Sequence, residues 1–133
     1  EVMLHGRADD ARVAKAQDAL KAVGRLACVL VGDITQPEAC SRLSKEAEAA
    51  GGIDVLVNNV GVYKPTDLAA TDPAHWRWTF AGNLDATFYM LHAFLPQLLR
   101  HPHARVIQMG FVGCDQARGS AQATLLLNHK QNV

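Results

Sequence analysis

The feature that most constrains the fold is a short apolar run ending in polar residues, GGIDVLVNNVG at residues 51–61. Its apolar centre does not alternate with polar residues, which predicts a strand covered on both faces. Asn58 and Asn59 would stand at the carboxyl end of that strand, where open α/β sheets bind ligands. Gly61 would let a ligand approach the backbone closely. The alternative is a plain asparagine-rich turn.

Composition narrows the class of protein. The 133 residues suit one domain, residues 1–133, and 13 basic against 13 acidic side chains indicate no nucleic-acid surface. No apolar stretch approaches the roughly 20 residues of a membrane span, so we expect a soluble protein without a membrane partner. Three scattered cysteines predict neither a disulfide framework nor a metal site. No leader pattern opens the chain, so a cytoplasmic location is expected.

Hydrophobic periodicity alternates between buried strands and amphipathic helices along the chain. This order predicts an α/β fold, a doubly wound parallel sheet with helices on both faces. Pro96 could kink or end the longest helix. We expect strands at residues 1–5, 26–31, 53–57 and 105–109, and helices at 8–23, from about 37, at 72–100 and from about 122.

Three short motifs occur in order after the second strand, after the third strand and within the long helix: Asp33-Ile34, Asn58-Asn59-Val60-Gly61 and Asn83-Leu84. In this order and spacing they resemble the short-chain dehydrogenase/reductase family, from residue 1 to about 112. The resemblance implies a Rossmann-like sheet and hydride transfer between a nicotinamide cofactor and a small carbonyl or alcohol substrate. It also implies a homodimer or homotetramer, and the apolar Trp78, Met90 and Phe94 could face a partner.

The resemblance assigns cofactor contacts residue by residue. Asp33 would accept a hydrogen bond from the adenine amino group, and Ile34 would lie against the ring. Asn59, Val60 and Gly61 would border the adenosine ribose and the nicotinamide side of the cofactor.

Arg7 stands where the family reads the adenosine ribose. An arginine there can pair with the 2′-phosphate of NADP, whereas NAD calls for an acidic residue, so Arg7 favours NADP over NAD. In the alternative, Arg7 only caps a turn and Asp9 or Asp10 contacts the ribose.

Two further residues match the family's catalytic set. Asn83 would hold a water of the proton relay; alternatively, it satisfies a buried backbone group. Lys130 matches the active-site lysine, which binds the nicotinamide ribose, or it is a solvated surface lysine.

The chain departs from the family at both ends of the pattern. Leu126 replaces the proton-donating tyrosine, Gly110 and Phe111 replace the serine region, and Ser120 and His129 are the conceivable substitutes. A catalytically impaired relative acting in cofactor binding or assembly is therefore the alternative function.

The family's first strand and glycine-rich phosphate turn are also lacking. Because that strand is central in the family, strand pairs 1–5 with 26–31 and 53–57 with 104–109 would have nothing between them. We therefore expect either a fragment of a longer protein or a sequence from which residues are omitted.

Overall fold

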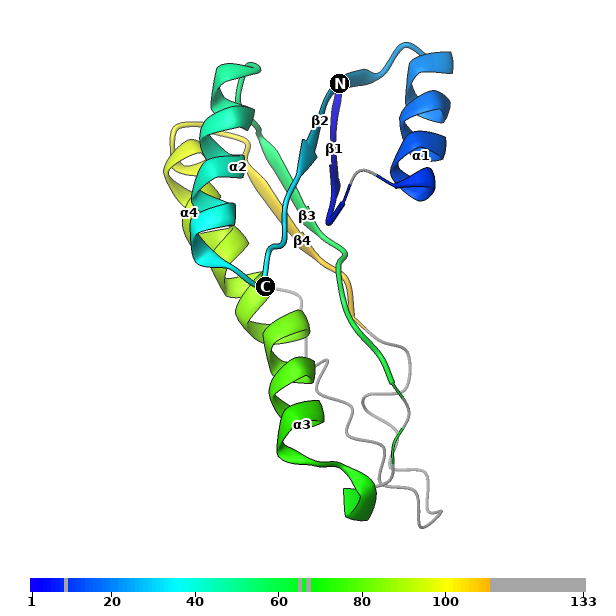
Figure 1. Ribbon diagram of the computed structural model, residues 1–133. Helices are drawn as coiled ribbons and strands as arrows, with labels where there is room; N and C mark the ends of the chain where they lie inside the picture. The colour runs from blue at the N-terminus through cyan, green and yellow to red at the C-terminus, as the bar shows by residue number, and fades with distance from the viewer. Residues whose placement is uncertain (9, 65, 67, 111–133) are drawn as a thin grey trace.

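The structure is a computed structural model that describes residues 1–8, 10–64, 66 and 68–110. Strands and helices alternate as the sequence pattern predicts, and the strands lie between α1 on one side and α2 with α4 on the other (Figure 1). The elements are β1 (Val2–Gly6), α1 (Ala11–Ala22), β2 (Leu26–Val31), α2 (Pro37–Ala49), β3 (Val55–Asn58), the 3₁₀ turn η1 (Leu68–Ala70), α3 (Pro73–Phe80), the π-helical turn η2 (Ala81–Asp85), α4 (Ala86–Leu99) and β4 (Arg105–Gln108).

The described strands form two separate parallel pairs. β1 pairs with β2, and β3 pairs with β4, as the family resemblance implies. A groove of about 620 Å³ lies between the pairs, lined by residues of β1 and β3 and floored by Ala86, Met90 and Phe94 of α4. The α/β class with a parallel, Rossmann-like arrangement is therefore confirmed, and so is the gap between the two pairs.

Backbone hydrogen bonding shows which edge of β3 borders the groove. The N–H of Arg105 donates to the carbonyl of Asp54, and the N–H of Met109 donates to the carbonyl of Asn58. Because backbone groups alternate between the two edges of a strand, those of Val55 and Val57 turn away from β4. They face the side on which the groove lies.

The core lies between the strands and the pair of helices α2 and α4. Its buried apolar side chains come from β2, β3, α2, α4 and the loop after β2: Leu30, Ile34, Cys40, Leu43, Ala47, Leu56, Ala86, Met90, Phe94 and Leu98. Burying a side chain of leucine or phenylalanine size contributes roughly 1.5–3 kcal/mol. Gln97 joins the two helices by donating to the carbonyl oxygen of Ser44 at 2.7 Å and to its Oγ at 2.9 Å.

The single long helix expected at residues 72–100 is divided in the structure. Asp72 caps α3 by accepting a hydrogen bond from the N–H of His75 at 2.7 Å, and the π-helical turn η2 separates α3 from α4. Pro96 does not end the helix, since α4 continues to Leu99.

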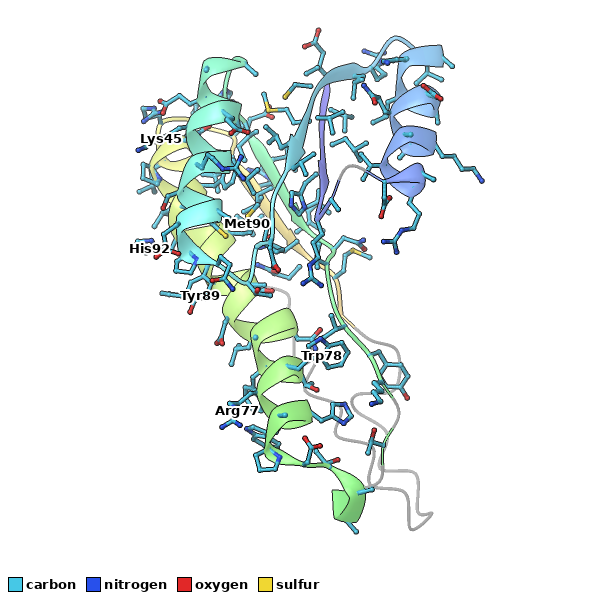
Figure 2. The ribbon with its side chains drawn as sticks, viewed as in Figure 1. Lys45, Arg77, Trp78, Tyr89, Met90 and His92 are labelled. Atoms are coloured by element: carbon cyan, nitrogen blue, oxygen red, sulfur yellow. The ribbon has the colours of Figure 1, made fainter. Side chains whose placement is uncertain are left out.

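Two of the three residues expected to face a partner lie in the core instead. Met90 is 7 % exposed and Phe94 is 2 % exposed, whereas Trp78 is 43 % exposed. Trp78 projects from α3, well apart from Met90 on α4 (Figure 2). α4 carries apolar residues on more than one face. The face with Met90 and Phe94 packs into the core, whereas Phe88 and Leu95 stay exposed.

Candidate functional site

The polar ends of the strands gather at one end of the groove. His5 comes from the end of β1, Ile34 follows β2, and Asn58, Asn59 and Val60 lie at the end of β3 and just beyond it; all five line the groove. The ring Nε2 of His5 lies 2.9 Å from the carbonyl oxygen of Gly32, which fastens β1 to the loop after β2. Open parallel sheets bind ligands at this edge.

Arg7 and Asp33 meet at the ends of β1 and β2. Arg7 Nη2 lies 2.9 Å from Asp33 Oδ2, and the Arg7 side chain is 76 % exposed. The other carboxylate oxygen, Oδ1, accepts hydrogen bonds from Thr35 Oγ1 at 2.7 Å and from the Thr35 N–H at 3.0 Å. These Thr35 hydrogen bonds, and then the Arg7 charge, hold the pKa of Asp33 below its ordinary value against partial desolvation. The carboxylate is therefore ionised at neutral pH.

Asp10 and Ile34, which lie near Arg7 and Asp33 in the sequence, have structural roles. Asp10 caps α1 by accepting hydrogen bonds from the N–H groups of Arg12 at 2.9 Å and Val13 at 3.1 Å. This use of its carboxylate weakens the alternative in which Asp10 contacts a ribose; Asp9 lies outside the described residues. Ile34 is 8 % exposed and belongs to the core, so most of its side chain packs against protein.

Asn83 joins the π turn to the loop that follows β3. Its Oδ1 accepts a hydrogen bond from the Val62 N–H at 3.0 Å, and its Nδ2 donates to the Val62 carbonyl at 3.0 Å and the Thr79 carbonyl at 2.9 Å. All three of these side-chain hydrogen bonds join Asn83 to backbone groups. The Asn83 carbonyl accepts a hydrogen bond from Thr87 Oγ1 at 2.8 Å.

The chemical end of the expected site falls mostly outside the described residues. Phe111, Leu126 and Lys130 lie there, as do the conceivable substitutes Ser120 and His129. Gly110 is described and is exposed just after β4. Asn59, Val60 and Gly61 are exposed at the other strand end.

Sequence reasoning missed three contributors to this edge: Thr35, Val62 and Gly82. Asp33-Ile34-Thr35 carried a usable signal, because an aspartate often accepts a hydrogen bond from the backbone two residues on. Gly82 carried another, since an isolated glycine inside a helical pattern often has a packing reason. Val62 carried none, because its partner Asn83 lies 21 residues away.

Two classes of site find no support in the described part of the chain. No group of three or more histidine, cysteine, aspartate or glutamate side chains there is placed to hold a metal ion. Within the same residues, no helix combines the length and apolar character needed to cross a bilayer.

A family model described as short chain dehydrogenase matches residues 1–123 of the chain. The chain belongs to the short-chain dehydrogenase family. Galactitol 2-dehydrogenase (L-tagatose-forming) of Cereibacter sphaeroides is 32 % identical over 85 residues, 64 % of this chain and 34 % of that protein. Short-chain dehydrogenase/reductase eriH of Hericium erinaceus is 31 % identical over 118 residues, 85 % of this chain and 47 % of that protein.

Solved structures of the family share this arrangement. A 3-oxoacyl (acyl-carrier-protein) reductase of Agrobacterium tumefaciens C58, with NADP bound, matches with a TM-score of 0.76 and 30 % identity over 91 % of this chain and 46 % of that one. The NADH-dependent reductase A1-R′ complexed with NAD gives a TM-score of 0.77 and 26 % identity over 91 % of this chain and 53 % of that one.

The matched regions cover only part of these relatives. The chain spans about a third of the length of galactitol 2-dehydrogenase, and about half that of the two solved reductases. The relatives are named as dehydrogenases and reductases, which does not favour the catalytically impaired alternative.

Proposed function

We propose that the whole protein is an NADP(H)-dependent oxidoreductase that transfers hydride between the nicotinamide and the carbonyl or alcohol carbon of a small molecule. When bound, the cofactor supplies the hydride chemistry, and the protein supplies binding and orientation. Family membership supports the reaction class. Arg7 beside Asp33 is the observation that supports NADP over NAD.

Arg7 is well suited to a phosphate. Its guanidinium is largely exposed, and its pairing with Asp33 is a surface ion pair of the kind that contributes about 0–1 kcal/mol. A phosphate can accept two parallel charge-assisted hydrogen bonds from one guanidinium, a geometry that arginine favours. Arg7 can therefore exchange its carboxylate partner for a 2′-phosphate at little cost.

The loop after β3 suits the remainder of the cofactor. Asn59, Val60 and Gly61 are exposed beyond the strand end, and Gly61 has no side chain to obstruct a ligand that lies against its backbone. In this proposal Asp33 contacts the adenine amino group through its ionised carboxylate, while Ile34 offers the adenine only the small part of its surface that the core leaves uncovered.

The test compares Arg7→Gln with Arg12→Gln in the whole protein. Both arginines are exposed and each pairs with an aspartate, but only Arg7 pairs with Asp33. Losing a charge-assisted contact of roughly 1.5–3 kcal/mol should weaken NADPH binding by about ten- to hundredfold in Arg7→Gln. Measured by calorimetry, the dissociation constant of Arg7→Gln for NADH should stay within about threefold of the wild-type value. The dissociation constants of Arg12→Gln for both cofactors should do the same.

Two results would contradict NADP selection by Arg7. In one, Arg7→Gln leaves the ratio of NADPH to NADH affinity unchanged. In the other, Arg12→Gln lowers that ratio as much as Arg7→Gln does, which would assign the effect to general surface charge.

We also propose catalytic roles for Asn83 and Lys130, based on the family resemblance, with Lys130 additionally binding the nicotinamide ribose. Lys130→Met should lower kcat by at least about tenfold, since positioning and proton-transfer groups commonly contribute that much. Lys45→Met, at an exposed lysine of α2, is the control and should leave kcat unchanged. An unaltered kcat in Lys130→Met would refute the role.

A homodimer or homotetramer formed through α4 is a further part of the proposal. Phe88 and Leu95 of α4 are exposed, and their i, i+7 spacing places them on one helical face. Phe88→Glu should shift the protein towards monomer in light scattering after size exclusion. Val23→Glu, at an exposed valine just after α1, should not. Identical masses for Phe88→Glu and the wild type would contradict this interface.

A cytoplasmic location completes the proposal. Cys28 and Cys40 are free thiols in the described part of the chain, which suits a reducing compartment. Cell fractionation should recover the protein with soluble cytoplasmic markers, and recovery from an oxidising compartment would contradict this location.

A further inference from the structure

Gly82 lies in the π turn η2, directly against the side chain of Val62. A Cβ atom added at Gly82 would come within 2.6 Å of one Val62 methyl carbon and 3.0 Å of the other, whereas ordinary contacts begin near 3.4 Å. Any side chain at position 82 would therefore push Val62 outward. Gly82 is not among the described glycines with a positive φ. Glycine is therefore required at this position for space and not for an unusual backbone conformation.

The next residue in the turn holds the backbone of Val62. Asn83 accepts from the Val62 N–H and donates to the Val62 carbonyl, both at 3.0 Å. Consecutive residues of one turn thus seat the same loop residue, one by its side chain and the other by its backbone. π turns inside α-helices often mark functional positions, because the extra residue redirects side chains.

Val62 directly follows the proposed cofactor wall, which consists of Asn59, Val60 and Gly61. β3 ends at Asn58, and Asn59, Val60 and Gly61 are the only residues between the strand end and the seated Val62. Such a short segment is held by its two ends. A displacement of Val62 therefore has to move this wall or change its backbone angles.

We propose that Gly82 is a positioning residue: its bare Cα sets how closely the 59–62 segment lies on the helix, and so where the cofactor wall stands. The inference rests on the proposed NADP(H) function. It adds a specific requirement at a residue that would touch neither cofactor nor substrate. Displacement by a Cβ would approach 1 Å, the difference between 2.6 Å and ordinary contact, and misplacements of that size can alter function greatly.

The test uses three variants of the whole protein: Gly82→Ala, Val62→Ala and the double variant. In Gly82→Ala we expect faster hydrogen exchange at the Val62 amide and a dissociation constant for NADPH raised on the order of tenfold. Alanine is a better helix former than glycine. Helix propensity alone would therefore make the Gly82→Ala variant more stable, whereas the displacement of Val62 should loosen the loop. In the double variant the missing valine methyl groups make room, and NADPH affinity should return to within about threefold of Val62→Ala.

Leu84→Ala is the neighbouring control, since Leu84 is exposed in the same turn. It should leave both the exchange rate of Val62 and NADPH affinity unchanged. All affinities are compared at a temperature where circular dichroism shows each variant fully folded.

Unchanged NADPH affinity in a folded Gly82→Ala protein would overturn the positioning role, even if exchange at Val62 becomes faster. So would a double variant that fails to recover. If the wild type binds neither NADPH nor NADH, the proposed function fails instead. In that case, exchange at Val62 and its recovery in the double variant still decide whether Gly82 seats the loop.

Discussion

Replacing Asn83 with leucine removes one side chain that holds three backbone groups together. The amide is buried, and its hydrogen bonds to Val62 and Thr79 are all close to 3.0 Å. At roughly 1 kcal/mol for each hydrogen bond, Asn83→Leu should lower the free energy of unfolding by about 3 kcal/mol. For a chain of this size that corresponds to a Tm lower by roughly 10 °C.

Urea unfolding followed by circular dichroism measures the change directly, with the free energy taken by linear extrapolation. Leu84→Ala in the same turn is the matched control, and its exposed position predicts a change within about 0.5 kcal/mol. A loss for Asn83→Leu no greater than that of the control would refute the view that this amide fastens the loop to the helix.

Three further predictions concern the core and the charged edge. The hydrogen bonds from Thr35 and the Arg7 charge lower the pKa of Asp33 from its ordinary 3.8. The contribution of Asp33 to stability is thus present above pH 3.8 and is lost as the pH falls through the folded pKa. In urea unfolding between neutral pH and pH 3, the free energy of unfolding should therefore fall less in Asp33→Asn than in the wild type. Equal decreases would contradict this. Phe94→Ala should cost about 3–5 kcal/mol in the same assay, because the ring is almost fully buried, and a change below about 1 kcal/mol would refute its place in the core. Burial raises the pKa of the Cys40 thiol, so mass spectrometry should find it unlabelled by a thiol reagent at neutral pH until the protein unfolds, and rapid labelling of the native protein would contradict its burial.

Local apolar patterning was sufficient to predict the strands. The predicted strand at residues 26–31 has the observed bounds of β2, because a continuous apolar run between polar turns leaves little freedom in a buried parallel strand. The separation into two strand pairs was also predicted, since it follows from strand order rather than from side-chain detail. The start of α2 at Pro37 was also as expected, whereas α1 begins at Ala11 and not at residue 8. Asp10 and Asp72 cap α1 and α3, and the observed helices begin one residue after each.

The division of the long helix could not be predicted from its own residues. The π turn coincides with contacts to Val62, which lies about twenty residues earlier in the chain and in a loop. Apolar residues occupy more than one face of α4, so its sequence alone does not tell that Met90 and Phe94 are buried while Phe88 and Leu95 stay exposed. Packing against the strands and α2 decides which face of α4 is buried.

The candidate site was likewise predictable in part: the sequence indicated which residues lie at this edge, but not how their side chains contact one another. Arg7 and Asp33 were proposed from the family resemblance, and the residues after β3 from their place at a strand end. Their position at one edge follows because parallel strands bring their carboxyl ends together. The pairing of Arg7 with Asp33 and the two duties of the Asp33 carboxylate depend on side-chain geometry, which motif spacing does not carry.

Hydride transfer itself is the most direct test of the central claim. The whole protein would be incubated with NADPH deuterated at the transferable position and a panel of aldehydes and ketones, and the products examined by mass spectrometry. We expect deuterium at the carbinol carbon of at least one alcohol product, with slower transfer from NADH and from the Arg7→Gln variant with NADPH. Saturable NADPH binding with no label in any product would contradict the oxidoreductase function proposed for this member of the short-chain dehydrogenase family.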